Sequence, residues 1–339
     1  MRILSGVQPS GKLHLGNYFG AIRQFVELQH KGEALYFIAN LHALNSVRDG
    51  RLAYELTLET AAAFLALGLD ANKAILFRQS DILELGELYW ILGTLVPMSH
   101  LERAHSYKDK KARGLSADLG LFAYPVLMAA DILIYNSDWV PVGKDQIQHL
   151  EFCRDWATKF NVTYVPGYDA ANPNGENGSP PGIFKLPEAF VREETSVLLG
   201  TDGQKMSKSY GNTLELFGEE KEIKKKMMSI KTDSSPIEAP KPTQNSALFE
   251  LLKAMAPPSE WPEIEASWRA GGLGYGAYKK KLVDYFHLCF DEPRKRFGEL
   301  MGDKAELERI LVEGAQKARA CAAPIIQKMR AAVGISRGG

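Results

Sequence analysis

The chain has 339 residues, 45% hydrophobic and 24% charged, which is the composition of an ordinary folded protein and excludes a mainly disordered chain. Lysine plus arginine equals aspartate plus glutamate, 41 each, so the overall charge indicates no nucleic-acid partner and any basic surface must be local. Three cysteines without CxxC spacing argue against a disulfide framework or a structural zinc site, and no apolar run approaches roughly 18 residues, so we expect a cytoplasmic α/β chain without a membrane span.

The first part of the chain alternates between strand and helix patterns. Short apolar runs at 2–4, 35–39 and 74–77 predict buried strands. Between them, residues 17–28 and 53–69 carry apolar side chains at helical spacing. Strands that alternate with helices favour a parallel sheet with crossover helices, so we expect an α/β fold class with a Rossmann-like domain.

Three later segments complete the outline. Residues 83–102 are apolar enough to form either a helix pair in the core or a surface that buries against a second subunit, and both readings stay open. Residues 170–182 are dense in Asn, Gly and Pro and predict a loop. Beyond Gly218 the strand patterns fade and helical periodicity dominates, so we expect an α/β domain at 1–217 and an all-helical domain at 218–339.

A glycine-containing turn at 6–20 follows the first strand (GVQPSGKLHLGNYFG). Glycines allow a ligand to approach the backbone, and the free N–H groups of a helix start favour negative charge. His14 and Asn17 can both donate to phosphate oxygens, and Gly16 leaves room for a nucleotide ring. Taken alone, such a turn is more often structural, and it fits neither GxGxxG nor the P-loop pattern.

A second polar loop carries two lysines, Lys205 and Lys208, around a small hydroxyl residue in the pentapeptide KMSKS. Lysines in a flexible loop can fold over a triphosphate and neutralise the charge that develops on a pyrophosphate leaving group. A solvated loop would be the preferred reading if this pentapeptide stood alone.

The two motifs occur together, and as a pair they resemble the signatures of class I aminoacyl-tRNA synthetases. Residues 14–17 (HLGN) match the pattern known as HIGH, and residues 205–209 match KMSKS letter for letter. Further segments are similar to the bacterial tryptophanyl-tRNA synthetases, namely GVQPSGKLHLGNYFGAIRQF, 41–44, 124–131 and 140–150. The resemblance is dense from residue 3 to about residue 209 and continues more loosely to the C-terminus.

The resemblance implies an amino-acid site in which Asp131 accepts the indole N–H of tryptophan. A carboxylate suits this role because indole offers one donor and no acceptor, although Asp131 could instead cap a helix N-terminus. Met128 would line the pocket as a soft side chain. The other implied pocket residues are Tyr124 and Gln146 at the ammonium and carboxylate, His42, which could equally be structural, and Val142.

The same resemblance implies an ATP site. Lys205 and Lys208 would hold the pyrophosphate, with His14 and Asn17 as the other catalytic side chains. Lys110, in a segment that could also be a solvated basic loop, would reach the phosphates from a mobile loop. The remaining implied contacts are Gln8, Ser10, Gly16, Gly143, Asp145, Met206 and Ser207. Mg²⁺ is expected with ATP, but no carboxylate cage stands out, so no metal ligand is named.

Three features depart from the family pattern. Leu4 stands where the family commonly has an aromatic residue, and Lys144 turns the family's GEDQ into GKDQ, which reverses a charge near the amino-acid site. Residues 167–195 align poorly and look like an insertion. These departures bear on the substrate pocket rather than on the ATP motifs.

The implied activity is the ligation of tryptophan to tRNA(Trp) through an adenylate, by a homodimer whose helical part binds the anticodon region. Lysine and arginine clusters at 224–226, 279–281 and 294–296 are candidate backbone contacts, although each could be a solvated face. Three rivals remain: a tyrosine-specific enzyme of the same fold, a nucleotidyltransferase without tRNA, and a synthetase-like regulatory protein that binds RNA. An intact His14 and a complete KMSKS loop disfavour the last.

Overall fold

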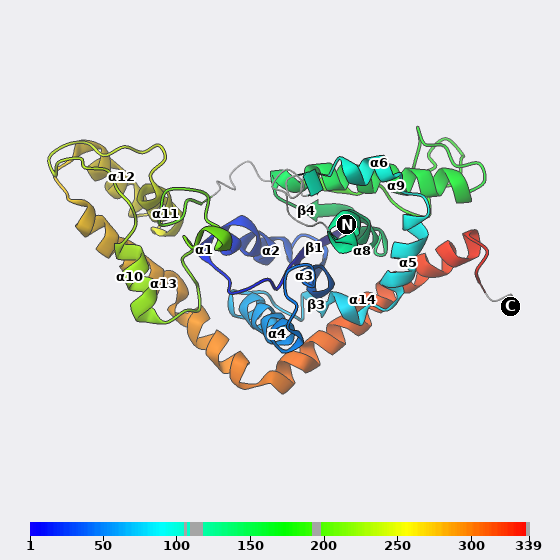
Figure 1. Ribbon diagram of the computed structural model, residues 1–339, viewed down its shortest axis with the longest axis horizontal. Coiled ribbons are helices and arrows are strands. Elements are labelled where there is room, and N and C mark those ends of the chain that lie inside the picture. Colours follow the sequence, from blue (N-terminus) through cyan, green and yellow to red (C-terminus); the bar gives the residue numbers. More distant parts are fainter. Residues whose placement is uncertain (105–106, 109–117, 192–197, 337–339) are drawn as a thin grey trace.

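The computed structural model describes residues 1–104, 107–108, 118–191 and 198–336, and Figure 1 shows a central sheet with helices packed around it and a helical arm to one side. All five strands are parallel, in the order β3-β2-β1-β4-β5. Their bounds are β1 Arg2–Val7, β2 Glu33–Ile38, β3 Ala74–Arg78, β4 Trp139–Pro141 and β5 Glu188–Phe190. The predicted parallel α/β sheet is therefore confirmed.

The three strands read from the sequence are the long ones, and the two that were missed are short. β4 and β5 have three residues each, and β4 ends in a proline, so neither contains the apolar run that identifies a strand. β1 pairs with both β2 and β4 and thus lies in the middle of the sheet, with the turn that follows Val7 at its carboxyl end.

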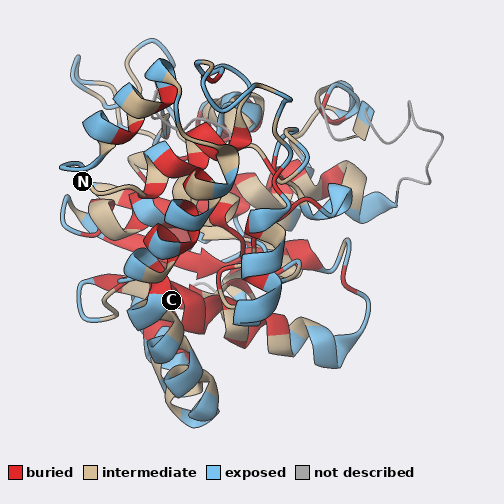
Figure 2. Ribbon diagram, turned by 90° about the vertical axis from the view of Figure 1, so that its left-hand side faces the viewer, coloured by how far each residue is buried: buried red, intermediate tan, exposed pale blue. Residues whose placement is uncertain are grey.

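Side chains of the middle strands alternate between two cores, as the two-residue period of a strand requires. On one face Tyr36 and Ile38 pack with α2 (Arg23–Leu28) and α4 (Gly50–Ala66). On the other face Leu35 and Phe37 pack with the helices that follow β3 and flank β4. Figure 2 shows these buried residues gathered in the sheet and on the helix faces that cover it.

The helices between β1 and β5 largely follow the predicted pattern. The segment predicted as one helix at 17–28 is split by a π-helical turn, Tyr18–Ile22, between α1 and α2. The loop predicted at 170–182 contains no helix or strand. The bounds of the remaining helices in this part are α1 Leu15–Asn17, α3 Asn40–Ala43, α5 Glu84–Gly93, α6 Met98–Glu102, α8 Leu119–Leu133 and α9 Ile147–Tyr164.

The apolar segment at 83–102 has both a buried and an exposed side. Leu85, Leu88 and Leu92 of α5 are buried in the core that includes α8. Leu83 and Trp90, by contrast, are 75% and 71% exposed. One side of the segment is thus ordinary core, and the other leaves large apolar side chains at the surface.

The chain beyond residue 218 is helical, as predicted, and it ends by returning to the sheet. Its helices are α10 Glu220–Met228, α11 Ala247–Met255, α12 Trp261–Ala270, α13 Tyr275–Gly302 and α14 Lys304–Ala332. In Figure 1, α13 and α14 form a V below the sheet, and α14 runs along the edge strand β3. A β-carbon on Gly314 would lie 1.8 Å from the carbonyl oxygen of Leu76, so this glycine permits the close approach. The boundary at 217/218 stays a prediction.

No helix within the described ranges is both long and apolar enough to cross a membrane.

Candidate active site

The first motif lies where β1 ends and α1 begins. Gly11 takes a positive φ of 132° in the turn, and His14 precedes the first residue of the helix. The backbone N–H of His14 donates to Asn17 Oδ1 at 3.1 Å, which fixes both residues of the motif at the helix start. The His14 side chain is 6% exposed, and burial lowers its pKa to about 4, with the nearby Lys208 ammonium acting in the same direction. His14 is therefore a neutral hydrogen-bonding group at neutral pH.

The KMSKS loop lies directly against this turn. Lys208 Nζ donates to the carbonyl oxygen of Gly11 at 2.9 Å, and the N–H of Gly16 points at Met206 Sδ at 3.3 Å. Asn212 Oδ1 accepts from the N–H of Ser207 at 2.8 Å and so holds the base of the loop. Burial lowers the pKa of the Lys208 ammonium, an effect that a bound anion would oppose. The turn at 11–17 and the KMSKS loop, almost 200 residues apart in the sequence, thus lie in direct contact.

Between the two motifs lies an open cavity of about 1010 Å³. Eleven of the twelve residues predicted for the ATP site line it, including both ends of the loop at 143–145. They are Gln8, Ser10, His14, Gly16, Asn17, Gly143, Asp145, Lys205, Met206, Ser207 and Lys208. Lys110 falls outside the described residues. Lys144 also lines this cavity and does not line the smaller cavity that adjoins it.

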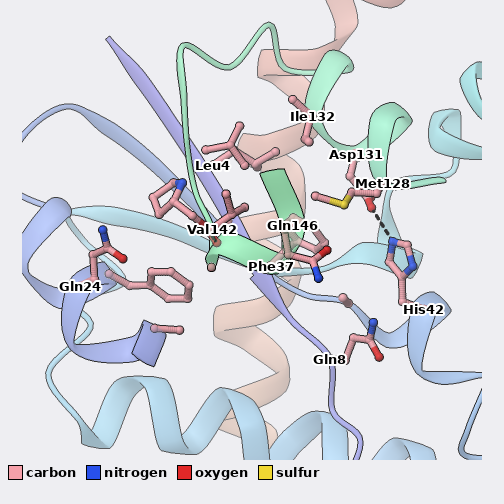
Figure 3. Close-up of a pocket in the computed structure, with 18 of the residues that line it drawn as sticks. Leu4, Gln8, Gln24, Phe37, His42, Met128, Asp131, Ile132, Val142 and Gln146 are labelled. Carbon is pink, nitrogen blue, oxygen red and sulfur yellow. Dashed lines mark hydrogen bonds and ion pairs between the residues drawn. The ribbon is translucent and has the colours of Figure 1, made fainter. Parts of the chain in front are cut away.

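A second cavity of about 270 Å³ adjoins the first, and Gln8, Gly20 and Gly143 line both. Figure 3 shows that its side chains include residues from β1, α2, β2, α3, α8 and the segment after β4. All six predicted amino-acid contacts lie here: His42, Tyr124, Met128, Asp131, Val142 and Gln146. Leu4 and Phe37 add apolar wall, so this chain supplies an aromatic ring from β2 next to the aliphatic Leu4.

Asp131 is a buried carboxylate on the wall of this cavity. It lies in the last turn of α8, so the alternative that it caps a helix N-terminus is wrong; Asp118 holds that position. His42 Nε2 lies 3.0 Å from Asp131 Oδ2, and Gln79 Nε2 donates to both carboxylate oxygens at 2.8 and 2.9 Å. Burial raises the pKa of Asp131, and the hydrogen bonds from His42 and Gln79 oppose that rise. The carboxylate is thus held by Gln79, which lies outside the cavity lining, and by His42, which is part of that lining.

Two residues of this site were not found from the sequence. Gln79 follows the apolar run of β3 as one polar residue among several, and no local pattern distinguishes it. His149 hydrogen-bonds through Nε2 to the Tyr124 hydroxyl, and it stands in the segment 140–150 that carried the family resemblance without receiving a role. Neither residue was identified because its hydrogen-bond partner, Asp131 for Gln79 and Tyr124 for His149, is distant in the sequence.

Comparison with known proteins places this geometry in a family. The family model described as tRNA synthetases class I (W and Y) matches residues 1–291. The tryptophan–tRNA ligases of Campylobacter jejuni strain RM1221 and of Rhodopirellula baltica are each 49% identical to the chain over 335 residues, which is 99% of this chain and 100% of each relative.

A solved structure agrees with these relatives. The tryptophanyl-tRNA synthetase of Campylobacter jejuni, in complex with ADP and tryptophan, superposes with a TM-score of 0.87 at 48% identity and covers 98% of this chain and 100% of its own. The chain belongs to the class I tRNA synthetases of the tryptophan and tyrosine family.

Proposed function

We propose that the chain is a tryptophan–tRNA ligase that activates L-tryptophan with ATP and transfers it to the 3′ end of tRNA(Trp). The observation that carries this function is the pair of adjoining cavities. One presents the lysines of the KMSKS loop and the other presents the Asp131 carboxylate, and Gln8, Gly20 and Gly143 form their shared border. An amino acid bound in the small cavity therefore has its carboxylate next to the phosphates of a nucleotide in the large one.

In the first step the tryptophan carboxylate attacks the α-phosphorus of ATP in line, and the bond from that phosphorus to the pyrophosphate oxygen breaks. The products are tryptophanyl-adenylate and pyrophosphate. No protein nucleophile is needed, so positioning and charge stabilisation supply the rate. Lys205 and Lys208 would stabilise the charge on pyrophosphate, while neutral His14 and the Asn17 amide would donate to phosphate oxygens.

In the second step a ribose hydroxyl at the tRNA 3′ end attacks the acyl carbon, and AMP leaves. Mg²⁺ would enter with ATP and neutralise phosphate charge, since phosphates together with one or two carboxylates are its usual partners. Among the described residues that line the large cavity, Asp145 supplies a carboxylate, so it would be the protein ligand that complements the phosphates around Mg²⁺.

Selection of tryptophan over tyrosine would rest on Asp131. A phenol both donates and accepts, whereas indole only donates. His42 and Gln79 both direct donors at Asp131, which leaves an acceptor facing the cavity. Met128 and Phe37 supply the apolar walls that a flat bicyclic ring requires.

The finer assignments concern tRNA and the second subunit. Several basic residues of the helical part are already engaged: Lys226 with Glu215, and Arg294 with the carbonyl oxygens of Leu216 and Gly218. Exposed Lys280 and Lys281 are thus better candidates for tRNA backbone contacts from the domain at 218–339. An enzyme that charges tRNA acts where translation occurs, so we place it in the cytoplasm.

The homodimer is proposed from the exposed apolar side of 83–102. Leu83, Trp90 and Met98 are 75%, 71% and 63% exposed, and large apolar side chains gathered on one segment favour a protein interface. Sedimentation at working concentration tests this, because a monomer would contradict it.

The test of the function is ATP–pyrophosphate exchange with each of the twenty amino acids in turn. Exchange with tryptophan alone is expected. Exchange with tyrosine would retain the class but overturn the assignment of the pocket, and exchange with none would overturn the enzymatic function.

A further inference from the structure

Gln79 is a buried amide behind the amino-acid pocket. It follows β3, at the start of the short helical turn Gln79–Asp81, and is 1% exposed. It does not line the cavity, so it cannot touch a bound amino acid directly. Any effect of Gln79 on the reaction must therefore act through the residues to which it is hydrogen-bonded.

The hydrogen bonds of Gln79 fix the orientation of its amide. Oε1 accepts from the backbone N–H groups of Leu41 and His42 at 3.0 and 3.4 Å. Because those groups can only donate, the oxygen must face them, and the NH₂ group must face Asp131. Nε2 reaches the two carboxylate oxygens at 2.8 and 2.9 Å. The amide therefore joins the start of α3 to the end of α8.

This arrangement defines what Asp131 can do. An ionised carboxylate has about four lone-pair sites; Gln79 donates to both oxygens from outside the cavity lining, and His42 approaches Oδ2 from within that lining. Hydrogen bonds from one amide to both oxygens fix the plane of the carboxylate, and Asp131 lines the cavity in that orientation. The same amide accepts from the backbone N–H of His42, so Asp131 and His42 keep one relative position.

We propose that Gln79 is a specificity-determining positioning residue, which holds Asp131 as a hydrogen-bond acceptor and so makes the pocket select a ring N–H. The inference rests on the proposed role of Asp131 toward the indole ring. It adds a residue outside the pocket whose donors determine which amino acid the pocket accepts.

The sharpest test is Gln79→Glu. This change keeps an oxygen for the N–H groups of Leu41 and His42 but replaces the donor that faces Asp131 with a second acceptor. In tryptophan-dependent pyrophosphate exchange, we expect KM for tryptophan to rise about 10- to 100-fold, the range for a lost charge-assisted hydrogen bond in a buried site. KM for ATP should stay within about twofold, and kcat should change less than KM for tryptophan.

A second readout uses an analogue of tryptophan in which sulfur replaces the ring N–H (3-benzothienylalanine). The wild type should prefer tryptophan strongly, because the analogue leaves the Asp131 acceptor unpaired. In Gln79→Glu this preference should fall at least about tenfold. If Gln79 had a merely structural role, its substitution would reduce activity with tryptophan and with the analogue by the same factor.

The chain offers a matched control in the next pair of residues. Asn40 Nδ2 donates to Ser80 Oγ at 2.8 Å and Asn40 Oδ1 accepts from the N–H of Ser80 at 3.1 Å, so this pair joins the same two segments without touching Asp131. Asn40→Ala should leave the preference for tryptophan over the analogue unchanged. If Gln79→Glu does not fold, Gln79→Met, of similar length and without donors, takes its place.

The outcomes distinguish the role of Asp131 from the role of Gln79. A wild type that uses both amino acids equally would refute the role of Asp131. A wild type that discriminates, with Gln79 variants that discriminate just as well or lose both substrates in parallel, would overturn the role of Gln79 alone.

Discussion

The Lys208 ammonium donates to the backbone carbonyl oxygen of Gly11 at 2.9 Å, so a side chain of the second motif is held by the turn that opens the first. The two residues are 197 positions apart. The ammonium has three N–H donors, so Lys208 can contact a phosphate oxygen with another N–H while it keeps this hydrogen bond. Hydrogen bonds between charged groups are stronger than those to a neutral carbonyl, so a phosphate oxygen would be the stronger partner.

Lys208→Ala should slow adenylate formation about 100-fold or more, which is the effect of removing one preorganised donor from a developing charge. KM for tryptophan should change little, because Lys208 lines the large cavity and not the small one. Single-turnover formation of tryptophanyl-adenylate measures the rate. Lys221→Ala, at an exposed lysine of α10, is the control, and an unchanged rate in Lys208→Ala would remove this lysine from the mechanism.

His14→Gln should reduce the loss of stability on acidification. Burial lowers the pKa of His14 to about 4, so between pH 4 and its ordinary value the unfolded chain binds a proton that the folded chain does not. Stability therefore falls as pH decreases through this window, by about 2 kcal/mol between pH 7 and pH 5 according to linkage. Urea unfolding of both proteins at the two pH values measures the difference.

His30→Gln, at an exposed histidine, is the control for this comparison. An equal decrease in stability for the wild type and His14→Gln would show that His14 titrates normally.

Lys144→Glu should weaken ATP binding while leaving tryptophan binding unchanged. Lys144 is exposed on the lining of the large cavity, where an exposed charge several ångströms from a phosphate contributes about 1 kcal/mol, so KM for ATP should rise about fivefold. The effect should shrink as salt is added, because exposed charges are screened. Measurement of KM for ATP and for tryptophan at two salt concentrations tests this prediction. A rise in KM for tryptophan instead of ATP would place Lys144 at the amino-acid site.

Gly314→Ala should destabilise the protein by several kcal/mol, because the added carbon would lie 1.8 Å from the carbonyl oxygen of Leu76 and would force α14 away from β3. Gly298→Ala, within α13 and with open space around it, should instead stabilise by about 0.5–1 kcal/mol through helix propensity. Thermal unfolding of both variants provides the measurement. Equal melting temperatures for the two would contradict the close packing of α14 on the sheet.

The parts of the fold that the sequence predicts are those whose cause is local. β2 is a run of apolar residues, and α4 carries apolar residues at helical spacing. Both elements can therefore be predicted from residues that are close in the sequence. β4 is stabilised as a strand by pairing with β1 and β5, and its three residues carry no such pattern.

The candidate site divides in the same way. His14 and Lys208 lie in motifs whose letters are contiguous, so the resemblance could assign them. Gln79 acts on Asp131, 52 residues away, and nothing near either residue indicates the pairing. The placement of Lys144 on the lining of the larger cavity likewise depends on how the loop after β4 lies between the two cavities.

The path of α14 along β3 also affects how the chain is made. β3 ends at Arg78, and the helix that covers its free edge begins at Lys304, so more than 200 residues are synthesised in between. An uncovered edge strand offers unpaired N–H and C=O groups to other chains, and long nascent chains are vulnerable at this stage. A ribosome that stalls before Lys304 would thus release a polypeptide that carries both signature motifs and an adhesive sheet edge. The edge of β3 is therefore shielded from other chains only after synthesis has passed Lys304 and α14 has formed.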